Sequence, residues 1–299
     1  MTHIDIVAAV RSEAETLPEF VRQLRTLELP PDIELGAIFI EDSSDDDTVG
    51  ALRRFARGDP GLRYFALERG YGQGPAIAFG LQQSRADAII MMDVDGSHPL
   101  AAVPEMIRRY LAGARVVQCR RRSIEGRAAY RDVGTTAFHL TARLVSGVDL
   151  SQQNVYFRLV RADVAAEILA RPELWPWLRF ELPSEDSGEL AFVDVDARER
   201  RTGESKYAFG RLLRIGIDGM LAVTSLLRLI GLAIFAFGSA LFLSRAGHDL
   251  LAALVALPAL AGVWHYFALR RADPLARMRV VQTSVVTNST ADPSGSETG

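Results

Sequence analysis

The segment Ala88-Ile-Ile-Met-Met-Asp-Val-Asp-Gly-Ser-His-Pro99 changes abruptly from apolar to acidic. Its first five residues have no polar break, which is typical of a strand buried on both faces of a parallel sheet. In an open α/β sheet, ligands bind at the carboxyl ends of the strands. Asp93 and Asp95 follow such an end and could share a divalent cation, because magnesium takes a few carboxylates and completes its shell with phosphate oxygens and water. The alternative is that both carboxylates only cap the next helix. This segment alone does not separate the two interpretations.

Apolar strands and helices alternate around this segment. Strands are predicted at residues 4–10, 35–40, 62–67, 88–92 and 114–119. The Ser-x-x-Glu pattern of Ser12–Glu15 predicts a capping box and a helix that continues to about Leu27. Further helices are predicted up to about Ser84 and over residues 102–111. This alternation predicts an α/β fold with a Rossmann-like, mostly parallel sheet and helices on both faces.

Two loops that follow predicted strands carry further candidate residues. The octet 41–48 holds five acids, of which Glu41 and Asp42 are expected at a ligand site and residues 45–47 at a helix start. Residues 70–76 read Gly-Tyr-Gly-Gln-Gly-Pro-Ala before the next helix, and their backbone amides could approach a phosphate. The glycine spacing is not a dinucleotide fingerprint, and alone the motif is more often a plain loop.

The composition excludes several classes of function. The formal net charge of −3 gives no support for a nucleic-acid surface. The single cysteine, Cys119, excludes an internal disulfide and a multi-cysteine zinc site. Asp5 interrupts the first apolar run, so no secretory signal is expected.

The C-terminal third contains two long apolar runs. Leu229–Leu243 has no charged residue, and residues 250–269 contain only His265 as a potentially charged group. A membrane span needs roughly 20 apolar residues, so two transmembrane helices are predicted at about 226–243 and 250–269; a pair of buried core helices is the alternative. Arginines at the outer ends predict a multi-pass protein of the cytoplasmic membrane with both termini in the cytoplasm.

The predicted organisation has four parts. Residues 1–210 are expected to form the catalytic α/β domain and residues 211–225 an amphipathic juxtamembrane segment. Residues 226–271 are expected to form the two-helix transmembrane hairpin, and residues 272–299 a basic and then disordered cytoplasmic tail. A second Asp-Val-Asp, at residues 194–196, lies where acids alternate with apolar residues. That pattern indicates an exposed strand face, so these acids are not assigned to the site.

Several motifs, in this order, resemble the inverting family-2 glycosyltransferases of GT-A fold. Most similar are polyprenyl-phosphate sugar synthases of the dolichol-phosphate mannose synthase type with a two-helix membrane tail. The motifs cover about residues 5–210 and are Val10–Leu17, Ile40–Thr48, Gly72–Ala76, Met92–Pro99, Phe157–Leu159 and Arg201–Tyr207.

The resemblance implies roles for individual residues. It implies nucleotide-sugar contacts by Ala9, Glu13, Asp42, Gly72, Ala76, Asp93 and Val94. It implies Mg²⁺ or Mn²⁺ ligands at Asp93, Asp95 and Ser97. It implies acceptor-phosphate contacts by Arg127, Arg131, Arg201, Ser205 and Lys206. Asp95, Arg131 and Lys206 are the residues expected to contribute most to catalysis.

The implied reaction is metal-dependent, inverting transfer of a sugar from a GDP- or UDP-linked donor to a polyprenyl phosphate at the cytoplasmic membrane face. A phosphate monoester is mostly dianionic at neutral pH, so such an acceptor needs little help from a general base. The sugar, the nucleotide, the lipid length and any homo-oligomer are not determined by the sequence.

Two alternatives remain open. One is a glycosyltransferase for another lipid or polymer acceptor, which would need a catalytic base; Asp186 is the best of a weak set of candidates. The other is a non-catalytic membrane-bound GT-A module. Its support is the segment Gln152–Tyr156, where the family usually has an acid followed by small residues. Lys206 is the only lysine among 34 basic residues, and it falls on the family's Gly-x-Ser-Lys motif.

Overall fold

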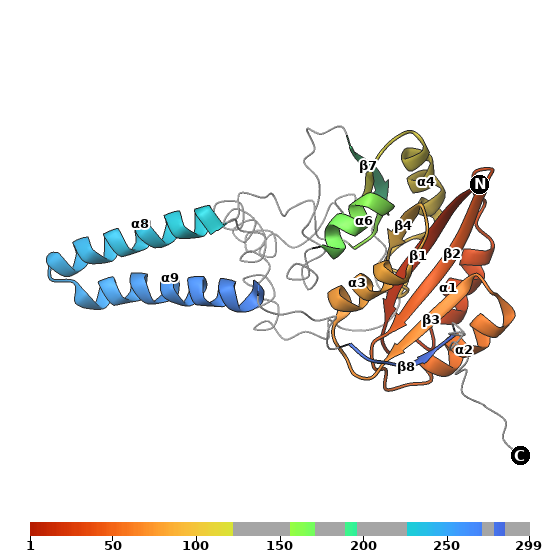
Figure 1. The fold of residues 1–299 in the computed structure, drawn as a ribbon, viewed down its shortest axis with the longest axis horizontal. Helices are drawn as coiled ribbons and strands as arrows, with labels where there is room; N and C mark the ends of the chain where they lie inside the picture. Colours follow the sequence, from red (N-terminus) through yellow and green to blue (C-terminus); the bar gives the residue numbers. More distant parts are fainter. Residues whose placement is uncertain (122–155, 171–188, 196–225, 271–277, 285–299) are drawn as a thin grey trace, which may run out of the picture.

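The computed structural model describes residues 1–121, 156–170, 189–195, 226–270 and 278–284 (Figure 1). An eight-stranded sheet, in the order β7-β5-β6-β4-β1-β2-β3-β8, forms the centre of the N-terminal part. The strands are β1 (Thr2–Val10), β2 (Ile33–Glu41), β3 (Leu62–Leu67), β4 (Ala88–Met91), β5 (Val116–Arg121), β6 (Arg158–Arg161), β7 (Leu190–Val195) and β8 (Val280–Thr283).

Most of the sheet is parallel, as the sequence predicts. Strand β1 pairs in parallel with β2 and β4, β2 pairs in parallel with β3, and β5 pairs in parallel with β7. Strand β6 is antiparallel to both β4 and β5, and β8 is antiparallel to β3. The antiparallel direction of β6 was not predicted, because a pattern of apolar residues does not reveal strand direction.

Helices cover both faces of the sheet. They are α1 (Leu17–Arg25), α2 (Thr48–Gly58), α3 (Gln73–Gln83), the 3₁₀ turn η1 (Leu100–Ala102), α4 (Val103–Leu111) and α6 (Ala162–Leu169). One apolar core lies under α1, α2 and α4, and a second lies under α3 and α6. Alternate residues of β1 enter different cores: Ile6 and Ala8 face α1, whereas Val7 faces α3. The predicted arrangement, a mostly parallel sheet with helices on both faces, is confirmed.

Two helices form a hairpin near the C-terminal end of the chain. Helices α8 (Leu226–Arg245) and α9 (Asp249–Arg270) lie side by side (Figure 1), joined by a turn at residues 246–248. The predicted helix positions therefore hold to within a few residues. Within the described ranges, no helix combines the length and the apolar character that crossing a membrane requires, so the predicted membrane spans are not confirmed.

The chain returns to the sheet after the hairpin. The Glu68 N–H donates to the Arg279 carbonyl at 2.9 Å, and the Tyr64 N–H donates to Ser284 Oγ at 2.9 Å. Residues 280–283 thus form an edge strand, where the sequence predicted only a basic tail. Strand β7 agrees better with its prediction: Val193 and Val195 are buried and Asp194 is exposed, as expected for a half-buried strand.

Candidate active site

The candidate site lies along the edge where the parallel strands β1, β2 and β4 end. Val10 at the end of β1 pairs with Glu41 at the end of β2, and Val7 pairs with Met91 at the end of β4. Asp42 directly follows β2, and Asp93 lies two residues after Met91. The structure therefore brings the loops that carry the predicted acids to one edge of the sheet.

Residues 93–98 form a closed acidic loop. The Asp93 N–H donates to His98 Nδ1 at 2.8 Å, which joins the two ends of the loop. Inside the loop, the Ser97 N–H donates to Asp95 Oδ1 at 2.9 Å. Gly96 has φ of +80°, a left-handed conformation that glycine adopts at little cost. The prediction that these acids merely cap the next helix is not supported, because η1 and α4 show no side-chain cap hydrogen bond.

Asp93 connects the acidic loop with helix α3. Gln73 Nε2, in the first residue of α3, donates to Asp93 Oδ1 at 2.5 Å. His98 Nε2 lies 3.7 Å from Asp93 Oδ2, and the Asp93 side chain is 23% exposed. The Asp93 carboxylate is thus held from two sides and still reaches solvent.

Asp42 holds the glycine loop. Its two carboxylate oxygens accept hydrogen bonds from the Tyr71 N–H at 2.6 Å and from the Gly72 N–H at 2.9 Å. Gly72 has φ of +93° and directly precedes α3. The sequence predicted that backbone amides of this loop could approach a phosphate, but these two amides donate to Asp42 instead. A role for Asp42 at the nucleotide base or ribose stays a prediction.

Glu13 lies in a loop that is joined to the loop after β2. The Glu13 N–H donates to Thr48 Oγ1 at 2.9 Å, and the Ser12 N–H donates to Ser44 Oγ at 2.9 Å. Ser12 has φ of +56°, an uncommon conformation for a residue with a side chain. The predicted capping box at Ser12 is therefore wrong, and α1 begins only at Leu17.

The remaining residues assigned to the nucleotide-sugar differ in exposure. Gly72 is exposed and Ala9 is partly buried. The side chains of Ala76 and Val94 are buried in the two apolar cores. A nucleotide-sugar could contact Ala76 and Val94 only through the backbone atoms of these two residues.

The acidic loop fits a divalent cation of the Mg²⁺ or Mn²⁺ type. Carboxylate oxygens suit these ions, and the described hydrogen bonds to Asp93 and Asp95 come from neutral amide donors. Over the residues that the structure describes, no three His, Cys, Asp or Glu side chains gather into a metal site. Asp93 and Asp95 could hold such an ion together with a diphosphate, and metal binding by them stays a prediction. Ser97 is buried, and a metal contact by its hydroxyl stays a prediction.

The residues predicted to bind the acceptor phosphate lie outside the described ranges. They are Arg127, Arg131, Arg201, Ser205 and Lys206. Their assignments stay predictions.

Three residues next to the acidic loop lie in the family motifs but were not assigned a role from the sequence. They are Gln73, which bonds Asp93; His98, which closes the loop; and Phe157, whose ring stacks on His98 with centroids 5.0 Å apart and planes inclined by 11°. A histidine five residues after the first aspartate of such a loop was an available signal. The stacking on Phe157 depends on the pairing of β6 with β4 and has no local signal.

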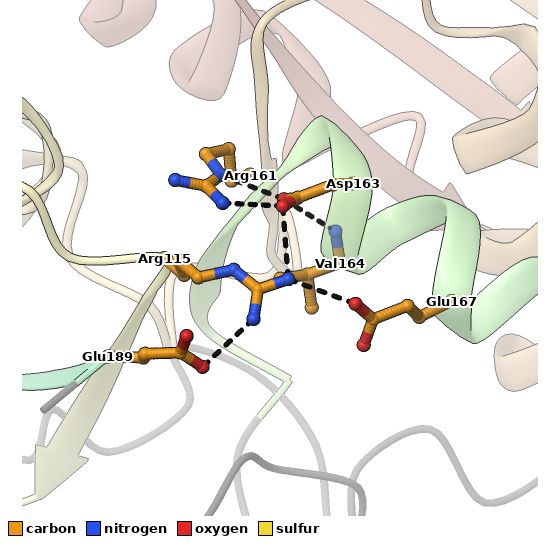
Figure 2. Close-up of polar contacts among 6 residues, drawn as sticks. All are labelled: Arg115, Arg161, Asp163, Val164, Glu167 and Glu189. Atoms are coloured by element: carbon orange, nitrogen blue, oxygen red, sulfur yellow. Dashed lines mark hydrogen bonds and ion pairs between the residues drawn. The ribbon is translucent and has the colours of Figure 1, made fainter. Parts of the chain in front are cut away.

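A second group of carboxylates lies at the opposite edge of the sheet. Arg115 donates to Glu189 at 2.9 Å, to Asp163 at 3.0 Å and to Glu167 at 2.9 Å (Figure 2). Arg161 also donates to Asp163, and this hydrogen bond is the main reason why the pKa of Asp163 lies well below its usual range. The cluster ties the starts of β5, β7 and α6 together and is structural in character.

Comparison with solved structures supports the GT-A-like fold. The glucosyl-3-phosphoglycerate synthase of Mycobacterium tuberculosis, solved with Mn²⁺, UDP-glucose and phosphoglyceric acid, has a TM-score of 0.51 and 18% identity; the match covers 74% of this chain and 78% of that chain. At this identity the similarity concerns the fold alone.

Similar sequences include transferases whose names specify a polyprenyl lipid, in one case as its phosphate. A prophage bactoprenol glucosyl transferase homolog of Escherichia coli K12 is 29% identical over 219 residues, which are 73% of this chain and 71% of the relative. An undecaprenyl-phosphate 4-deoxy-4-formamido-L-arabinose transferase of Pseudomonas syringae is 29% identical over 240 residues, 79% of this chain and 71% of the relative. The family model described as glycosyl transferase family 2 matches residues 5–168, more than half of the chain. The chain therefore belongs to glycosyl transferase family 2.

Proposed function

We propose that the protein transfers a sugar from a nucleotide-sugar to a polyprenyl phosphate at the cytoplasmic face of a membrane, with Mg²⁺ or Mn²⁺. The proposal rests on the position of the acidic loop 93–98 at the carboxyl edge of the sheet, where Gln73 of α3 donates a hydrogen bond to Asp93. The names of the bactoprenol and undecaprenyl-phosphate relatives support the acceptor class.

The reaction exchanges one bond at the anomeric carbon. An oxygen of the acceptor phosphate bonds to this carbon from the face opposite the leaving group, and the bond to the nucleoside diphosphate breaks. A bound divalent cation supplies Lewis acidity toward the departing diphosphate. Asp93 and Asp95 hold that cation, with Ser97 as a further candidate ligand, and Gln73 orients the Asp93 carboxylate. No general base is needed, because the acceptor phosphate is mostly dianionic at neutral pH.

The donor and the acceptor approach this loop from different segments of the chain. We assign the nucleotide to the loops around Glu13, Asp42 and Gly72, and either UDP or GDP is compatible with this assignment. The acceptor phosphate is assigned to Arg127, Arg131, Arg201, Ser205 and Lys206. Arginine forks and one ammonium group can hold a phosphate dianion beside the anomeric carbon.

The helical hairpin gives the protein its proposed attachment to the membrane. Large apolar side chains are exposed along both helices, among them Phe235, Phe242, Leu250 and Trp264. Exposed apolar surface of this extent is unfavourable in water and is typical of protein or membrane interaction sites. Because β8 joins the sheet edge only a few residues after α9, the hairpin would keep the catalytic domain close to a lipid acceptor.

The test is a transfer assay with the purified full-length protein. UDP- and GDP-linked sugars are supplied with Mn²⁺ or Mg²⁺ and a polyprenyl phosphate in detergent, and sugar-linked lipid is measured. We expect transfer with one donor class, loss of transfer on chelation of the metal, and no transfer to the unphosphorylated polyprenol. Transfer to the polyprenol, or donor turnover that does not depend on lipid phosphate, would contradict the proposed acceptor.

A further inference from the structure

His98 joins both ends of the acidic loop, and its hydrogen bond shows which ring nitrogen acts as the acceptor. His98 Nδ1 accepts the Asp93 N–H at 2.8 Å, so Nδ1 carries no proton. A neutral imidazole then has its proton on Nε2, the atom that lies 3.7 Å from Asp93 Oδ2. The His98 ring therefore lies next to both the backbone N–H and the carboxylate of Asp93.

The ring of His98 has a fixed position. Phe157 stacks on it at 5.0 Å, and the Phe157 side chain is fully buried. The Phe157 carbonyl accepts the Cys119 N–H at 3.0 Å, which fixes the Phe157 backbone on β5. The His98 side chain is 3% exposed, so the ring has little room to rotate. Through this stack, the central sheet determines where the first residue of the acidic loop lies.

We propose that His98 is a positioning residue, which holds the Asp93 end of the acidic loop in the conformation that binds the metal–diphosphate group. The inference rests on the proposed function, because it assumes that Asp93 and Asp95 bind a metal together with a nucleoside diphosphate. Residues that orient metal ligands in this way typically change metal affinity or activity by about 10–100-fold when they are replaced.

Two substitutions separate the hydrogen bond from the packing of the ring. His98→Phe keeps an aromatic ring for Phe157 and removes the acceptor. His98→Asn removes the ring and keeps an oxygen that can occupy the place of Nδ1. If His98 only fills space, His98→Phe is the milder change; if it positions Asp93, His98→Asn is the milder change.

The experiment is a titration of Mn²⁺ into the full-length protein in the presence of UDP or GDP, whichever the wild type binds. We expect a loss of Mn²⁺ affinity of about 10–100-fold in His98→Phe and recovery to within about threefold of wild type in His98→Asn. The Mn²⁺ requirement of the transfer reaction should shift in the same order. Wild-type affinity in a folded His98→Phe protein, or equal losses in both variants, would overturn the inference.

A second pair of variants covers the case in which His98→Phe does not fold. His98→Gln carries the same amide as His98→Asn one carbon further from the backbone, where its oxygen cannot replace Nδ1. We expect weaker Mn²⁺ binding in His98→Gln than in His98→Asn by roughly tenfold; equal binding would contradict the positioning role. Failure of the proposed function gives a different result, since wild type and Asp93→Asn would then show the same Mn²⁺ binding with nucleotide.

Discussion

Two groups of carboxylates lie at opposite edges of the same sheet, and the protein holds them in different ways. At the amino edge, Asp163, Glu167 and Glu189 share the guanidinium of Arg115 (Figure 2). These ion pairs place each negative charge next to a positive one. Hydrogen bonds to a charged partner are stronger than those between neutral groups, so this edge uses its charge for stability.

At the carboxyl edge, the described hydrogen bonds to Asp42, Asp93 and Asp95 come from amide groups. A neutral donor holds a carboxylate in position without cancelling its charge. These amide donors hold the carboxylates at the edge where β1, β2 and β4 end. In the described contacts, an arginine ties the acids of the amino edge to one another, whereas amide groups orient the acids of the carboxyl edge.

The largest expected effect comes from Asp95→Asn. This change removes one negative charge from the acidic loop and keeps an oxygen that can accept the Ser97 N–H. We expect sugar transfer to fall by about 100-fold, equivalent to roughly 2.7 kcal/mol in the barrier, with an unchanged melting temperature. Asp163→Asn, at the other edge, is the control and should keep the transfer rate of the folded protein. Transfer by Asp95→Asn at the wild-type rate would show that the metal assignment is wrong.

Arg115→Met should have the largest effect on stability. It leaves three carboxylates close together without their shared cation, and the Arg115 side chain is only 20% exposed. We expect the free energy of unfolding, measured by urea denaturation, to fall by clearly more than in the control. The control is Arg54→Met, which removes an ion pair between two exposed side chains and should cost less than about 0.5 kcal/mol. Equal losses in the two variants would remove the distinction between the edges.

Asp42→Asn tests whether the carboxyl edge also contributes to stability. The amide retains one acceptor oxygen and places an NH₂ group against either the Tyr71 or the Gly72 N–H. We expect a loss of about 1 kcal/mol in the free energy of unfolding. Binding of the nucleotide-sugar should also weaken, because the glycine loop belongs to the proposed nucleotide site. A variant with wild-type stability would mean that these hydrogen bonds do not hold the loop.

The smallest effect concerns the pH dependence of stability at the amino edge. Hydrogen bonding to Arg161 lowers the pKa of Asp163 in the folded protein. The ionised carboxylate therefore contributes stability at pH values above the pKa of an aspartate in the unfolded chain, which is about 3.9. This contribution is lost as the pH falls below that value. The stability difference between wild type and Asp163→Asn should therefore shrink below about pH 4. A difference that stays constant between pH 7 and pH 3 would contradict the assignment.

The sequence predicted most of the sheet, because continuous apolar runs are a local signal of buried strands. Strand β3 was predicted at its observed bounds, and β1, β2 and β4 were predicted to within two residues at each end. Strand β8 was missed, because it is four residues long and its partner β3 lies more than 200 residues earlier. Short strands at that separation depend on tertiary pairing and leave little local pattern.

The candidate site was predicted only in part, because only some of its residues have a local signal in the sequence. The acidic loop follows a recognisable strand, so Asp93 and Asp95 could be found from the sequence. Their partners Gln73 and His98 were not found, since both contacts depend on how the loop folds back and on where α3 packs. The capping box at Ser12 failed because the side chain of Ser44, 32 residues away, binds the Ser12 N–H instead.

The most direct test of the central claim is the binding of Mn²⁺ measured by calorimetry in the presence and absence of UDP or GDP. Two carboxylates should bind the ion weakly alone and at least about tenfold more tightly when a diphosphate supplies further oxygen ligands. Asp93→Asn should remove this nucleotide-dependent gain and leave the protein folded. Equal Mn²⁺ affinity with and without either nucleotide, or an unchanged gain in Asp93→Asn, would contradict the assignment of the acidic loop as the metal–diphosphate site.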